Sequence, residues 1–233
     1  MSETQHLSLK ALSVLLCYPE APMYQALPEI AQVLTDDTLL PNSQITAIKQ
    51  LITGFQQTDL IALQENYVRL FDRGRMLSLH IFEHIHGESR DRGQAMVDLM
   101  DMYQYHGFEL NVHELPDYIP LFLEYLSQRP AAEACESLGD IAHILHLLAQ
   151  RLEAKQSLYF MIFDALSALA GKERADIRQV PKAEVETDES ILKMDEIWEE
   201  EIVSFMANPK GCGGQTAEAQ PLVFTPPKQA NVH

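Results

Sequence analysis

Apolar residues recur three or four positions apart along most of this chain, which is the spacing of one face of an α-helix. The clearest series consists of Ala134, Leu138, Ile141, Leu145, Leu148 and Leu152. Its spacing predicts one helix. The sequence lacks the alternation of apolar and polar residues between turn dipeptides that marks β-strands. The chain is therefore predicted to be all-α, a single bundle of about nine or ten helices.

Proline, aspartate and glycine residues predict several helix ends. Pro41 can open a helix at its first position, where no backbone N–H is needed. Asp59 can cap the next helix by accepting a hydrogen bond from a backbone N–H. Gly107 is expected to stop the helix that precedes it. Pro116 is expected to start another helix, which continues to about Ser127.

Composition divides the chain into a core and a C-terminal part. The expected parts are a helical core at 1–175, a linker at 176–189, an acidic amphipathic helix packed on the core at 190–206 and a flexible, disordered tail at 207–233. The acidic helix is predicted from apolar residues that keep helical spacing between Ile191 and Phe205. Its Trp198, the single tryptophan of the chain, is expected to pack on the core. The tail is rich in Pro, Gly and Gln and has no periodicity.

The chain is strongly acidic, with 34 Asp and Glu against 17 Lys and Arg, a formal net charge of −17. This balance disfavours binding to nucleic acid, which requires a basic surface, and docking to anionic lipid. It suits a basic partner, or it serves solubility alone. The three cysteines form no C-x-x-C pair, and no run of about eighteen apolar residues occurs. We therefore expect a cytoplasmic protein that does not insert into the membrane.

Residues 70–98 depart from this acidic composition. Four of the nine arginines and three of the nine histidines lie there, and acids and bases are equal in number between Asp72 and Arg92. The planar guanidinium suits bidentate pairing with carboxylates, so the segment is expected to form a polar network that holds the chain at bends. The predicted network consists of Asp72, Arg73, His84, Glu88, Arg90, Asp91 and Arg92. The alternative is that some of its members face a ligand.

His80, Glu83 and His84 match H-x-x-E-H, the inverted motif of zinc peptidases. The motif is short and no third ligand is evident, so no metal site is predicted. Hydrogen bonding within the polar network is the favoured role of His84 and His86, with Glu83 or Glu88 fixing their tautomers. No nucleophile with an adjacent base is apparent either, so the chain is not expected to be an enzyme.

Three longer motifs carry a family resemblance. They are F-D-R-G-R at 71–75, F-E-H-I-H-G-E-S-R-D-R-G-Q-A-M at 82–96 and E-L-P-D-Y-I-P-L-F-L-E-Y-L at 114–126. They resemble the family of helical molybdoenzyme maturation chaperones, with similarity from about Leu9 to Gly213.

The resemblance implies a system-specific chaperone for respiratory nitrate reductase. Such a protein binds the N-terminal segment of the apo catalytic (alpha) subunit, supports insertion of the molybdenum cofactor and delays docking to the membrane. The cofactor belongs to the client, so none is expected to be bound stably by this chain. A helical adaptor for another molybdoenzyme is the alternative, and a zinc peptidase is a less favoured one.

The resemblance also implies a client-binding site, because related chaperones line their peptide groove with the matching Pro-Asp segment. The predicted client-binding residues are Tyr67, Phe71, Arg75, Phe82, Glu83, His86, Asp117, Tyr118 and Pro120. Residue chemistry alone leaves a second interpretation open. In it, Pro116 and Asp117 form a rigid loop-to-helix junction in which the carboxylate favours the first helical turn.

Overall fold

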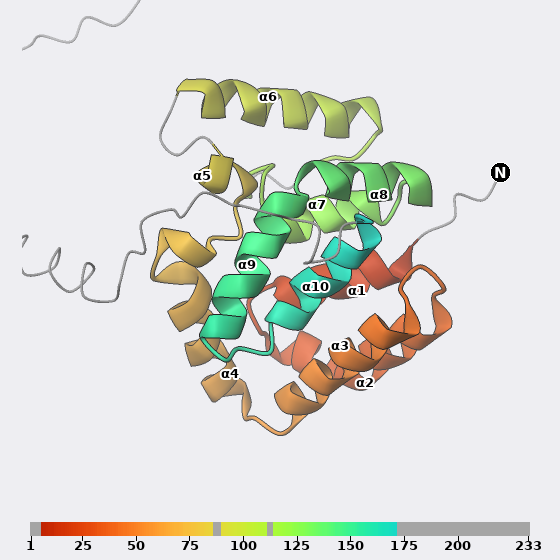
Figure 1. The fold of residues 1–233 in the computed structure, drawn as a ribbon, viewed down its shortest axis with the longest axis vertical. Helices are drawn as coiled ribbons and strands as arrows, with labels where there is room; N and C mark the ends of the chain where they lie inside the picture. Colours follow the sequence, from red (N-terminus) through yellow and green to blue (C-terminus); the bar gives the residue numbers. More distant parts are fainter. Residues whose placement is uncertain (1–5, 86–89, 111–113, 172–233) are drawn as a thin grey trace, which may run out of the picture. The chain divides into compact units, whose positions relative to one another are not determined.

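The computed structural model describes residues 6–85, 90–110 and 114–171. Their regular secondary structure is helical, apart from one isolated backbone bridge between His80 and Tyr118, which confirms the all-α prediction. The ten α-helices of this part of the chain are α1 (Leu7–Leu16), α2 (Ala21–Asp36), α3 (Asn42–Gln56), α4 (Leu60–Tyr67), α5 (Ile81–Ile85), α6 (Arg90–Tyr105), α7 (Ile119–Leu126), α8 (Ala131–Asp140), α9 (Ala142–Ala154) and α10 (Phe160–Leu169). Figure 1 shows their arrangement.

Two irregular helices follow α4. A π-helical turn at Val68–Asp72 continues it, and a 3₁₀ turn at Arg75–Leu77 follows. The predicted linker, acidic helix and tail lie outside the described residues. None of the helices in the described ranges is long and apolar enough to span a bilayer.

Helix α1 contributes four fully buried leucines to the core. Leu9, Leu12, Leu15 and Leu16 have no exposed surface, because their spacing puts them on the buried side of the helix. Complete burial of one such side chain is worth about 1.5–3 kcal/mol. Helix α1 packs against α2 and α7, while α10 packs against α9 and α3 (Figure 1). These contacts hold the helices around one shared apolar interior.

Two of the predicted helix ends are confirmed, and in both the deciding contact or conformation lies within one helical turn. Asp59 Oδ1 accepts a hydrogen bond from the Ala62 N–H at 3.0 Å, which confirms it as the cap of α4. Gly107 has a φ of +72°, the left-handed conformation that glycine adopts readily, and it follows the end of α6 as predicted. Pro41 differs by one position, since it is the cap and α3 begins at Asn42.

The long apolar series forms two helices, so the prediction of one was wrong. Helix α8 ends at Asp140 and α9 begins at Ala142. Gly139 and Asp140 favour helix poorly, and the Ile141 carbonyl accepts hydrogen bonds from Ile144 and Leu145 that start the new helix. Buried apolar side chains continue on both sides of the break. The apolar spacing therefore identified the buried face but not the break.

Pro116 does not start a helix. Helix α7 begins at Ile119, with Pro120 in its first turn. The physical reason is long-range pairing. The Ile81 N–H donates to the Asp117 carbonyl at 3.0 Å, and the Ile119 N–H donates to the Leu79 carbonyl at 2.8 Å. These bonds pair Tyr118 with His80 in an isolated antiparallel bridge, and the Tyr118 N–H donates to the Leu115 carbonyl at 3.2 Å, so Pro116 and Asp117 lie in a turn before α7.

Candidate functional site

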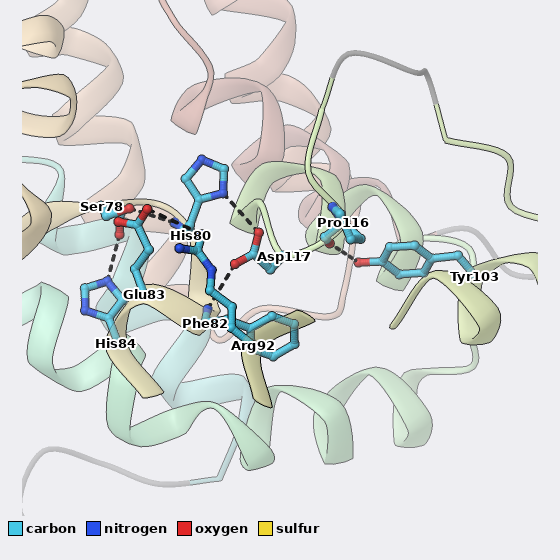
Figure 2. A network of polar contacts seen from close by, with 9 residues as sticks. All are labelled: Ser78, His80, Phe82, Glu83, His84, Arg92, Tyr103, Pro116 and Asp117. Carbon is cyan, nitrogen blue, oxygen red and sulfur yellow. Dashed lines mark hydrogen bonds and ion pairs between the residues drawn. The ribbon is translucent and has the colours of Figure 1, made fainter. Parts of the chain in front are cut away.

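The site is built around Asp117, whose side chain has no exposed surface. Its Oδ1 lies 3.1 Å from His80 Nδ1, and its Oδ2 accepts a hydrogen bond from the Phe82 N–H at 3.1 Å (Figure 2). Phe82 is in the first turn of α5, where backbone N–H groups have no partner within the helix. Asp117 therefore caps α5, a helix distant in the sequence, and not α7, the helix that follows it.

Other contacts fix the backbone on each side of Asp117. The Tyr103 hydroxyl donates to the Pro116 carbonyl at 2.9 Å, which joins α6 to the segment (Figure 2). The Ser13 hydroxyl donates to the Pro120 carbonyl at 2.6 Å, which joins α1 to it. Both contacts are buried. The segment that contains Asp117 is therefore bonded to α5, α6 and α1.

Ser78 and His84 form the other side of this framework. The Ser78 hydroxyl accepts a hydrogen bond from the His80 N–H at 3.2 Å, and His84 Nε2 donates to the Ser78 carbonyl at 2.8 Å. Burial lowers the pKa of His84 below 6.5, which favours the neutral ring. The tautomer of His84 is thus set by a backbone carbonyl, whereas Glu83, its predicted partner, forms an ion pair with Arg92 at 3.5 Å.

Aromatic side chains lie next to the framework. The Tyr67 hydroxyl donates to the Leu16 carbonyl at 2.9 Å, which leaves its oxygen to accept from the Tyr118 hydroxyl at 3.3 Å. The Tyr67 ring packs on Phe71, and Tyr18 approaches it edge-on at 5.6 Å. Burial raises the pKa of Tyr118 to about 12, so its hydroxyl stays protonated at neutral pH. Tyr67 and Phe71 are buried, Tyr118 is half-buried and Tyr18 is exposed.

An open pocket of about 360 Å³ lies beside these groups. It is lined by Phe71, Asp72, Arg73, Gly74, Arg75, Ser78, His80 and Glu83. Three predicted client-binding residues, Phe71, Arg75 and Glu83, therefore come together with two members of the predicted polar network, Asp72 and Arg73.

The remaining predicted residues are distributed differently. Tyr67, Asp117 and Pro120 are buried and do not line the pocket, Phe82 and Tyr118 are half-buried, and His84 and Arg92 bond within the framework. Arg90 and Asp91 lie in α6, but the description does not extend to their side chains. His86 and Glu88 lie outside the described residues.

Sequence analysis did not assign Tyr18, Ser78 or His80 to the client-binding site. His80 is one of the three histidines of residues 70–98 and part of the zinc motif, and neither pattern connects it with its partner Asp117, 37 residues away. The contact between the Tyr18 and Tyr67 rings likewise joins two separate helical regions. The aromatic character of Tyr18 just after α1 was the one available signal.

The two histidines of the zinc motif have separate partners. His80 precedes α5 and contacts Asp117, while His84 lies in α5 and contacts Ser78. They are not two ligands on one face of a helix, as the motif requires. Within the described ranges, no group of three or more His, Cys, Asp or Glu side chains is arranged to hold a metal ion.

Comparison with known proteins places this arrangement in a family. Residues 21–165 match the family model described as nitrate reductase delta subunit. The nitrate reductase molybdenum cofactor assembly chaperone NarJ of Escherichia coli K12 is 44% identical over 219 residues, which cover 94% of this chain and 92% of NarJ. NarW of the same organism, named as a probable chaperone of the same kind, is 37% identical over 85% of this chain and 83% of NarW.

A crystal structure from Archaeoglobus fulgidus, described as a redox enzyme maturation protein, is similar in fold. Its TM-score is 0.52 with 24% sequence identity, covering 70% of this chain and 92% of that protein. This likeness shows the fold, and the family follows from the sequence comparisons. The family model matches more than half of the chain, and the relatives match nearly all of it. This chain therefore belongs to the nitrate reductase delta subunit family.

Proposed function

We propose that this chain is a system-specific chaperone for the assembly of nitrate reductase. It binds the N-terminal segment of the apo catalytic (alpha) subunit in the cytoplasm, supports insertion of the molybdenum cofactor and delays docking of that subunit to the membrane. The cofactor is the client's, and the chaperone catalyses no reaction. The observation that carries this proposal is the 44% identity to NarJ across 94% of the chain, because similarity of this extent covers the framework and the pocket together.

The geometry suits recognition of a peptide. Aromatic side chains beside a polar pocket resemble the combination of buried anchors and oriented polar groups by which helical peptides are held in grooves. In this proposal Tyr118, Phe71, Arg75 and Glu83 contact the client together with Phe82 and His86. The buried residues Tyr67, Asp117 and Pro120 support them from behind.

The members of the polar network take two roles in the proposed site. His84 and Arg92 bond to neighbouring parts of the chain and hold α5 in place. Asp72 and Arg73 are exposed and line the pocket, so they border the client. In the same proposal Glu88, Arg90 and Asp91 belong to the polar network.

The function is tested by capture of the client from nitrate-respiring cells. Tagged chaperone should retain the apo catalytic subunit, and a catalytic subunit without its N-terminal segment should no longer be retained. In cells lacking this chain, the catalytic subunit should contain little molybdenum and should reach the membrane before it is active. Retention of a different molybdoenzyme would indicate the adaptor alternative, and a fully loaded nitrate reductase in the deleted strain would contradict the proposal.

The location of the client site is tested at Tyr118. Tyr118→Ala removes a half-buried ring and should weaken binding of the client's N-terminal peptide at least about tenfold, which corresponds to about 1.4 kcal/mol. Tyr105→Ala is the matched control, because Tyr105 is 86% exposed and contributes little to the core. Equal binding by the two variants would place the peptide elsewhere on the chain.

A further inference from the structure

His80 has a ring nitrogen that the framework does not use. Both Asp117 oxygens are acceptors, so the hydrogen of the 3.1 Å contact must belong to His80 Nδ1. The other nitrogen, Nε2, makes no hydrogen bond with the described part of the chain. The side chain is 29% exposed and lines the pocket, so this nitrogen is available to a bound group.

The orientation of the ring is set before anything binds. The Ser78 hydroxyl accepts from the His80 N–H, and the backbone bridge to Tyr118 fixes the residue on that side. The imidazole also packs against the Tyr118 ring with centroids 5.4 Å apart. A polar group held by its neighbours in this way loses little conformational freedom on binding, which favours its use in recognition.

The pocket is lined by charged side chains of both signs. Arg73 and Arg75 contribute two positive charges, and Asp72 and Glu83 contribute two negative charges. Glu83 forms an ion pair with Arg92, so a cationic client side chain would meet the two arginines against Asp72 and be repelled, and a client carboxylate has no hydrogen to donate to Nε2. An uncharged polar group meets no such repulsion and needs a single well-placed partner.

We propose that His80 is a specificity-determining residue of the client site, and that its Nε2 accepts a hydrogen bond from an uncharged hydroxyl or carboxamide side chain of the client's N-terminal segment. Asp117 is the positioning residue that keeps the proton on Nδ1 and turns the acceptor nitrogen outward. This inference rests on the proposed function and adds the chemistry by which the pocket selects its ligand.

Two substitutions separate recognition from structural support. The amide of an asparagine lies near the position of Nδ1, so His80→Asn keeps a donor for Asp117 and loses the group at Nε2. It should melt close to the wild type and bind the client peptide about tenfold more weakly. The longer side chain of His80→Gln carries its amide nearer to Nε2. This variant should be less stable but should retain more of the binding. His143→Gln is the control, since His143 is exposed on α9 and does not line the pocket.

The ligand is identified by double-mutant cycles with synthetic peptides of the client's N-terminal segment. Each Ser, Thr, Asn and Gln of the peptide is replaced by Ala, as is each Lys and Arg, and binding is measured by calorimetry. One hydroxyl or carboxamide replacement should cost about tenfold, or about 1.4 kcal/mol, with the wild-type chaperone and almost nothing with His80→Asn.

Four outcomes would overturn the inference. Additive losses for every uncharged position would mean that His80 contacts none of them. Coupling to a Lys or Arg position would show that the pocket selects a charged ligand. Failure of the wild-type chaperone to bind any client peptide would reject the proposed function as well, whereas unchanged binding by His80→Asn and His80→Gln would reject the role of His80 alone.

Discussion

The side chains of Asp117 and His80 are 37 residues apart in the chain and meet at 3.1 Å, with the carboxylate fully buried. A buried carboxylate is stable when hydrogen bonds surround it, and Asp117 has one at each oxygen. The pair fastens the start of α5 to the start of α7. This junction holds one wall of the pocket, because both His80 and Glu83 depend on the position of α5.

Asp117→Ala is expected to destabilise the fold strongly. It removes two hydrogen bonds to a charged group and leaves the Phe82 N–H without its partner, at a cost on the order of 3 kcal/mol in the free energy of unfolding. Urea denaturation followed by circular dichroism measures this loss. Asp101→Ala is the control, because Asp101 is exposed on α6 and should change stability by less than about 0.5 kcal/mol. Equal stability of the two variants would contradict the role of the junction.

Tyr103 is expected to hold α6 to the body of the protein. Among the described side chains of this helix it is the one that is fully buried, and its hydroxyl donates to the Pro116 carbonyl. Tyr103→Phe leaves that buried carbonyl without the bond and should cost about 1–2 kcal/mol. Hydrogen exchange should become faster throughout α6 while the amides of α1 and α9 stay protected. Tyr105→Phe, at an exposed position, should leave both measurements unchanged.

His84 is expected to make stability depend on pH. Burial lowers the pKa of His84 below 6.5, whereas unfolding exposes the ring and restores the ordinary value. Between these two values the unfolded chain binds more protons than the folded one. The stability contributed by neutral His84 is therefore fully present above about pH 6.5 and is lost as the pH falls through that value towards the lowered pKa.

The measurement is the melting temperature between about pH 7.5 and pH 5.5. His84→Gln keeps a donor for the Ser78 carbonyl but does not titrate, so its melting temperature should fall less over this range than that of the wild type. Parallel curves for the two proteins would mean that the ring of His84 is free to take up a proton in the folded state.

The formal charge of −17 is expected to accelerate encounter with a basic client peptide. Salt shortens the Debye length from about 10 Å at 0.1 M to about 3 Å at 1 M. Stopped-flow association should therefore slow as salt rises over this range, while dissociation changes little because anchoring contacts remain. An association rate that does not respond to salt would assign the charge to solubility alone.

The sequence alone predicted the features that depend on neighbours within a few residues. Apolar spacing predicted the helices and their buried faces, since one helical turn brings residues three and four apart onto the same side. Asp59 and Gly107 were correctly placed at helix ends because a cap and a left-handed glycine act within a single turn. Motifs of unusual composition at 71–75, 82–96 and 114–126 were specific enough to indicate the family.

Tertiary structure decided what Asp117 does. The local pattern around Pro116 and Asp117 is compatible with a helix start, and the helix nevertheless begins at Ile119. The segment instead makes backbone hydrogen bonds to Leu79 and Ile81, and the Asp117 carboxylate contacts α5. Together these bonds stabilise the fold more than one additional helical turn would.

The same distinction explains the pocket. Residues 71–75 line the pocket together with His80 and Glu83. Ser13 and Tyr103 hold the neighbouring segment around Asp117, and their helices pack through apolar side chains. The Ser13 and Pro120 contact spans 107 residues of chain. Polar groups from separate helices meet only when the apolar faces of those helices pack together. A sequence pattern within one helix carries no information about which residues of another helix will lie beside it.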